Sequence, residues 1–209
     1  MTEITDPPGT AKTSDAAFRS LRRYNLVAAA VHAVQAIAVV VLSNGFTLPV
    51  TASYLQGPPG TPAAAPVTLA EIGVAWAITG FLVLSAVAHL VVASPIFFPR
   101  YVRGLRRHRN IFRWVEYSLS ASLMIVLIAM IVGISDVAAL VTIFGVNATM
   151  ILFGWLQEHY EEPGSGRWLQ YRRLGRWHDY LVGERAYITL SIVAKSLLAW
   201  QVFAGTLAG

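Results

Sequence analysis

Five stretches of the sequence are each 20 to 24 residues long and almost wholly apolar. A helix that crosses the hydrocarbon core of a bilayer needs roughly 20 such residues. Stretches of this length also exceed an ordinary β-strand. We therefore predict an all-α fold, a polytopic transmembrane bundle of five helices within residues 18–209. The predicted spans are residues 24–43, 72–94, 111–134, 137–156 and 187–207.

The composition excludes several other kinds of protein. Hydrophobic residues make up 56% of the chain and charged residues only 13%, about half of the charged fraction of a soluble domain. The chain has no cysteine, which excludes disulfides, thiolate metal sites and cysteine nucleophiles. Phosphate-binding glycine motifs, metal-binding histidine spacings and a nucleophile–base arrangement are also absent from the sequence. We therefore expect neither a metal site nor enzymatic activity.

The basic residues lie on one side of the predicted bundle. Those near the spans fall within residues 19–23, 100–113 and 167–185, whereas the segments on the other side, chiefly residues 44–71, contain no lysine or arginine. Because loops rich in lysine and arginine stay in the cytoplasm, we expect a multi-pass protein of the plasma membrane with a cytoplasmic amino end and an extracellular carboxyl end. The net charge of +5 then reflects topology and contact with lipid headgroups, and we expect no nucleic-acid partner.

The polar segments outside the spans differ in character. Residues 1–17 contain proline and glycine and predict a disordered cytoplasmic tail. Residues 44–71 predict an extracellular loop with a short strand near residues 51–55, long enough for a structural or partner-binding role. Residues 161–185 interleave tryptophan and tyrosine with arginine, which is typical of a segment lying on the cytoplasmic surface of the membrane.

Four ionisable side chains lie inside the predicted spans, where such groups are costly and usually functional. They are His32, His89, Glu116 and Lys195, each on a different helix. The predicted topology and a rise of 1.5 Å per residue place all four roughly 7–12 Å below the same cytoplasmic boundary. The sequence therefore predicts a cluster of titratable groups at one level of the bundle.

Lys195 and Glu116 form the natural pair in this cluster, because a carboxylate on a neighbouring helix offsets much of the cost of burying a lysine. An amine in such a place can condense with an aldehyde. Polar residues three or four positions away share the helix face of each ionisable group. These neighbours are Ser191 for Lys195, Ser120 for Glu116, Ser85 for His89 and Gln35 for His32.

Simpler interpretations stay open for the same residues. Glu116 lies near a helix end and could pair with Arg113, and Lys195 could extend its amine to the membrane boundary. The two histidines could be hydrogen-bonded core residues. Met124 and Asn147 could serve packing alone or line a ligand pocket.

Two segments resemble the heliorhodopsin family. One is Trp114-Val115-Glu116-Tyr117-Ser118-Leu119-Ser120-Ala121 with Met124, which is similar to the third helix of that family. The other runs from Trp177 to Arg185 and from Ser191 to Gln201, and is similar to the segment that leads into and through the last helix. The placement of His32, Gln35, Ser85, His89 and Asn147 fits the first, second and fourth helices of the family.

The resemblance implies a light-sensing membrane protein that binds all-trans retinal and does not pump ions. Lys195 would carry retinal as a protonated Schiff base, Glu116 would be its counterion, and Ser191 would lie beside it. His32 and His89, with Gln35 and other polar groups, would form a proton network. The resemblance also implies a homodimer. The family has seven helices, however, and the 30 residues between the fourth and last spans of this chain are too polar for the fifth and sixth.

Three functions follow as hypotheses. The first is the heliorhodopsin-like photoreceptor. The second is a non-photoactive membrane interaction subunit, a remnant with an incomplete retinal pocket. The third is a transporter or proton channel, for which the outer halves of the spans offer few polar residues.

Overall fold

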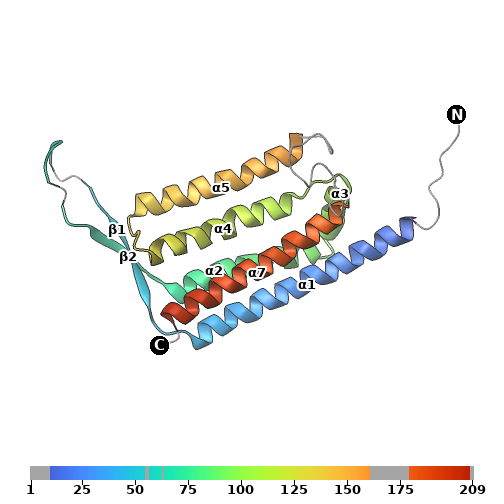
Figure 1. Ribbon diagram of the computed structural model, residues 1–209, viewed down its shortest axis with the longest axis horizontal. Helices are drawn as coiled ribbons and strands as arrows, with labels where there is room; N and C mark the ends of the chain where they lie inside the picture. Colours follow the sequence, from blue (N-terminus) through green and yellow to red (C-terminus); the bar gives the residue numbers. More distant parts are fainter. Residues whose placement is uncertain (1–9, 55–56, 63, 161–178, 208–209) are drawn as a thin grey trace.

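A computed structural model describes residues 10–54, 57–62, 64–160 and 179–207 of the chain. Figure 1 shows long helices lying side by side with a β-hairpin at one end. Five of these helices are long and apolar enough to cross a membrane, which confirms the predicted transmembrane helix bundle. In chain order they are α1 (Thr10–Leu42), α2 (Val74–Ala93), α4 (Ile111–Ile131), α5 (Val137–Tyr160) and α7 (Tyr180–Thr206).

Helix α2 is central to the packing. It contacts α1 on one side and α4 on the other, and α5 packs on the far side of α4 (Figure 1). Helix α7 packs mainly against α1. One apolar core cluster joins α1, α2, α4 and α7 and includes Ile78, Phe81 and Leu82, which are fully buried. By contrast, only Leu140 and Glu158 of α5 are buried.

The segment between α1 and α2 forms an antiparallel hairpin of strands β1 (Thr47–Ala52) and β2 (Val67–Gly73). The register places Thr47 opposite Gly73 and shifts between Val50 and Thr51. Thr51 also bonds to the turn between α4 and α5, since its backbone N–H donates to Ser135 O at 2.8 Å. The predicted loop is thus a strand pair anchored to the end of the bundle, which we call the hairpin end.

A short helix that the sequence did not predict, α3 (Phe98–Arg106), lies at the opposite end of the bundle. We call this end the α3 end. Tyr101 and Leu105 lie one turn apart on α3 and are buried in an apolar cluster that includes Phe18 and Leu21 of α1. The helix is too short and too rich in arginine to show the apolar run by which the spans were recognised.

Two helices begin earlier than the hydropathy pattern predicts. Residues 10–17, for which the composition predicts a disordered tail, belong to α1, and Asp15 pairs with Arg106 of α3 at 3.6 Å. Helix α7 begins at Tyr180 rather than at residue 187, because Asp179 accepts a hydrogen bond from the backbone N–H of Leu181 and so caps the helix. The rest of the predicted interfacial segment, residues 161–178, lies outside the described residues.

Candidate functional site

The side chains of Lys195 and Glu116 meet inside the bundle and form an ion pair between α7 and α4. Lys195 is 3% exposed and Glu116 is 7% exposed. Lys195 Nζ also donates a hydrogen bond of 2.6 Å to Ser85 Oγ on α2. The Lys195 amine is therefore enclosed between helices and paired, rather than exposed on the surface of the bundle.

Ser85 and Tyr117 complete the surroundings of the pair. The Ser85 hydroxyl lies 2.7 Å from Glu116 Oε1 and 2.9 Å from the carbonyl oxygen of Phe81, so its single proton can go to either. The Lys195 ammonium lies 5.2 Å from the centroid of the Tyr117 ring, which is within cation–π range. Three helices therefore hold one cation and one carboxylate in a fixed geometry.

His32 and His89 lie together, with nearly parallel rings whose centroids are 5.8 Å apart. Asn25, a residue that the sequence did not single out, fixes His89. The Asn25 amide donates to Leu21 O, so its carbonyl oxygen accepts the 2.8 Å bond from His89 Nδ1. A neutral His89 therefore carries its proton on Nδ1 and offers the lone pair of Nε2.

Several buried polar atoms near the pair have no hydrogen-bond partner among the described residues. They are both ring nitrogens of His32, His89 Nε2, Ser120 Oγ and Ser191 Oγ. A cavity of about 40 Å³ reaches from His89 and Asn25 past Glu116 and Tyr117. Because this space can hold at least one water molecule, it can satisfy part of this group. These unused hydrogen-bonding atoms could also contact a group bound beside Lys195.

The remaining predicted site residues lie around the pair with different partners. The Gln35 amide donates to Ser196 Oγ at 2.8 Å. Gln35 thus binds the residue that follows Lys195 in the chain and does not bind His32. Met124 packs against the central apolar cluster. The Asn147 amide donates to Ser122 Oγ at 3.0 Å and so joins α5 to α4. None of these contacts reaches the Lys195 amine.

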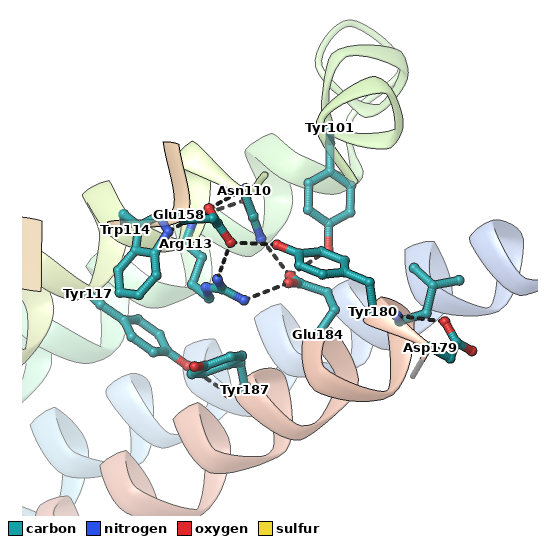
Figure 2. Close-up of polar contacts among 11 residues, drawn as sticks. Tyr101, Asn110, Arg113, Trp114, Tyr117, Glu158, Asp179, Tyr180, Glu184 and Tyr187 are labelled. Carbon is teal, nitrogen blue, oxygen red and sulfur yellow. Dashed lines mark hydrogen bonds and ion pairs between the residues drawn. The ribbon is translucent and has the colours of Figure 1, made fainter. Parts of the chain in front are cut away.

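Arg113 does not pair with Glu116, so that alternative interpretation was wrong. Its guanidinium instead lies between Glu158 of α5, at 2.8 Å, and Glu184 of α7, at 3.1 Å. It also stacks on Trp114 and Tyr187, with its central carbon 4.7 and 4.1 Å from the two ring centroids. Figure 2 shows this arginine cluster near the α3 end.

Uncharged donors complete the hydrogen bonding of the two carboxylates that flank Arg113. Glu158 accepts bonds from the Tyr180 hydroxyl, the Trp114 indole N–H and the backbone N–H of Asn110, at 2.7 to 2.8 Å (Figure 2). Glu184 Oε1 accepts from Tyr101 and from the Asn110 amide, at 2.8 and 2.6 Å. Such charge-assisted bonds are what a buried carboxylate requires.

One pattern in the sequence could have revealed the arginine cluster. Asn110, Arg113, Trp114 and Tyr117 recur at intervals of three and four residues, so they form a polar face on a helix that is otherwise apolar. Their acceptors were not evident, because Glu158 and Glu184 lie at helix ends far along the chain. The 40 Å³ cavity is also lined by Arg113 and Glu184, so it connects the two clusters.

Comparison with known protein families gives a match. The family model described as Heliorhodopsin matches residues 21–168 and 165–207, two segments that meet between α5 and α7. A search of curated proteins finds no match. Because the two matched segments cover most of the chain, this protein belongs to the heliorhodopsin family.

Proposed function

We propose that this chain is a light-sensing membrane protein that binds all-trans retinal as a protonated Schiff base on Lys195. The observation that carries the proposal is the buried ion pair between Lys195 and Glu116, with Ser85 bonded to both. Membership of the heliorhodopsin family supports a retinal-binding, light-sensing role in general terms. The buried amine, the facing carboxylate and the unpartnered Ser120 and Ser191 hydroxyls fit the reactive end of such a chromophore.

Bound retinal would supply the light-driven isomerisation, and the residues of the chain would hold charge and protons. Glu116 would keep a negative charge opposite the nitrogen on Lys195, and Ser85 would orient both. His89 is held through Nδ1 by Asn25 and would offer Nε2 as a proton acceptor on the same cavity as Glu116. His32, whose ring stacks on that of His89, would complete this proton network. A proton that moves only within this cluster would not be pumped across the membrane.

The site is tested by detecting a covalent bond between retinal and the chain. The purified full chain is mixed with all-trans retinal, its visible absorption is recorded, and the linkage is reduced with borohydride and located by mass spectrometry. We expect a visible band and an adduct on Lys195. The chain has only one other lysine, Lys12, which provides a matched control.

The two lysine variants should behave in opposite ways. Lys195→Ala should lose both the band and the adduct, whereas Lys12→Arg should keep them. An adduct that survives Lys195→Ala would refute the site. A steady light-driven pH change in sealed vesicles would refute the assignment as a protein that does not pump.

One observation favours a second candidate, a non-photoactive membrane interaction subunit. The outward face of α5 is apolar and largely exposed, and a shallow groove of about 600 Å³ runs over Val146, Met150 and Phe153. A chain that takes up no retinal yet remains folded would favour this candidate. A homodimer that covers this face is compatible with both functions.

A further inference from the structure

A basic hollow of about 400 Å³ lies at the α3 end and borders the arginine cluster at Tyr101. It is bounded by Arg100, Arg103, Arg107 and Arg109, and by Trp155 and His159 in the last turns of α5. Its volume is within the roughly 300–1,000 Å³ of small-molecule pockets. No acidic side chain among the described residues lines it.

The backbone holds the arginines of the hollow in place. The N–H of Arg109 donates to Gly104 O at 3.0 Å and the N–H of His108 donates to Leu105 O at 2.9 Å, which is the Schellman pattern that ends a helix. His108 takes the left-handed conformation, φ 54°, that this pattern needs. A Cβ on Gly104 would lie 2.7 Å from the carbonyl oxygen of Arg109, so only glycine permits this tight turn.

Most of the positive charge in the hollow has no ion-pair partner in the part of the chain that the structure describes. Arg100 and Arg103 lie three residues apart on α3, Arg107 caps the end of that helix, and all three are exposed. They form no ion pair with any described residue, whereas the neighbouring Arg106 faces the other way and pairs with Asp15. Arg109 is bonded to the carbonyl oxygen of His159 at 2.9 Å, which carries no full charge.

The rest of the hollow is apolar and borders the membrane spans. Ile111 and Phe112, in the first turn of α4, line it together with Trp155. Directly along α4 and α5 lie exposed apolar side chains, among them Val115 at 48% and Phe153 at 62% exposure. A ligand with a phosphate group and a hydrocarbon tail matches both parts, since arginine binds phosphate with two parallel hydrogen bonds.

We propose that the basic hollow binds the phosphate headgroup of an anionic phospholipid, whose acyl chains lie along α4 and α5. Three observations support a lipid over a soluble anion. The hollow lies where the spans begin and end, its floor is apolar, and the arginine distribution predicts that this side faces the cytoplasmic leaflet, which is rich in anionic lipid. The proposal does not depend on retinal.

The test uses the full chain in detergent and native mass spectrometry with added phosphatidylglycerol or, as a neutral comparison, phosphatidylcholine. The wild-type chain should retain phosphatidylglycerol preferentially. The double variant Arg103→Gln/Arg107→Gln should bind it about 25-fold more weakly, at about fivefold for each arginine near an anionic surface. Restoring charge with Arg103→Lys/Arg107→Lys should recover only part of the affinity, because lysine cannot bind phosphate with a planar fork.

The matched control is Arg19→Gln/Arg23→Gln on α1. This variant removes the same charge at the same end of the bundle from two exposed arginines that do not line the hollow. It should change binding less than twofold, and both pairs of variants should keep wild-type circular dichroism. Equal losses in the two variants would refute a defined site.

Two other outcomes would also overturn the proposal. Equal retention of the two lipids would show that the arginines do not select an anionic headgroup, and would favour a soluble acidic partner as their ligand. Full displacement of phosphatidylglycerol by low-millimolar inorganic phosphate would identify a soluble anion as the ligand.

Discussion

The Tyr101 hydroxyl of α3 donates a hydrogen bond of 2.8 Å to the Glu184 carboxylate of α7. The two residues are 83 positions apart, and both are buried. Burial raises the pKa of the Tyr101 phenol well above its ordinary value, and the charge of Glu184 raises it further. The short helix outside the spans is thus bonded to the arginine cluster inside the bundle.

Tyr101→Phe should destabilise the protein by about 1.5–3 kcal/mol, because it removes a bond to a buried charged group. The pH dependence should change as well. Since the pKa of Tyr101 is raised in the folded state, its contribution to stability is complete below about pH 10 and declines as the unfolded phenol ionises above that pH. The thermal unfolding temperature should therefore fall less steeply between pH 7 and pH 11 for the variant than for the wild type. An unchanged slope would mean that the pKa of Tyr101 is not raised in the folded state.

Glu116→Gln should destabilise the retinal-free chain by about 3–5 kcal/mol, because it leaves the Lys195 ammonium buried without its partner. The double variant Glu116→Leu/Lys195→Met should be close to the wild type, since an apolar pair often replaces a buried ion pair at little cost. Denaturant or thermal unfolding in detergent compares the three proteins. A double variant as unstable as the single one would contradict the pairing.

Glu158→Gln should loosen the end of α5. The glutamine amide has only one acceptor oxygen, whereas the Glu158 carboxylate accepts bonds from Arg113, Tyr180 and Trp114 and from one backbone N–H. Hydrogen–deuterium exchange should rise in the last turns of α5. The neighbouring variant His159→Gln should leave the exchange unchanged, because the backbone rather than the side chain of His159 binds Arg109. Equal exchange in both variants would show that the arginine cluster does not hold the last turns of α5 in place.

Gly154→Ala should cost about 1–3 kcal/mol through overpacking, since a Cβ at this position would lie 2.5 Å from the Trp114 ring. Gly145→Ala on the same helix is the control, because nothing lies within 4 Å of its Cβ. That change should raise stability slightly through helix propensity. Thermal unfolding of the two variants should therefore shift in opposite directions. Shifts of the same sign would show that the close approach of α4 and α5 is not rigid.

The transmembrane bundle could be predicted because each span carries its own signal in about 20 consecutive residues. The pairing of Lys195 with Glu116 was predictable for a similar reason, since a lysine in an apolar helix needs a carboxylate within reach. The same logic did not reach Arg113, Glu158 and Glu184. Residues near helix ends can be satisfied by water or headgroups, so burial becomes evident only from the packing of α4, α5 and α7.

Other parts depended on contacts between distant segments. Gln35 was expected beside His32, but its amide binds Ser196, because the packing of α1 on α7 decides which residue it meets. Asn25 was overlooked because a single amide near the start of an apolar run resembles an ordinary boundary residue. Helix α3 owes its position to the burial of Tyr101 and Leu105 in a cluster shared by α1, α2 and α7, which hydropathy along the chain does not report.

The sparse burial of α5 bears on how freely this helix can vary between related proteins. Leu140 and Glu158 are its only buried residues, Gly154 is confined by a tryptophan ring and Asn147 joins α5 to α4. Most of its exposed apolar positions need only remain apolar, because the bilayer solvates them whatever their shape. Evolution can therefore rewrite most of the outward surface of α5 while four positions stay fixed, and new lipid or protein neighbours could be acquired there without disturbing the interior.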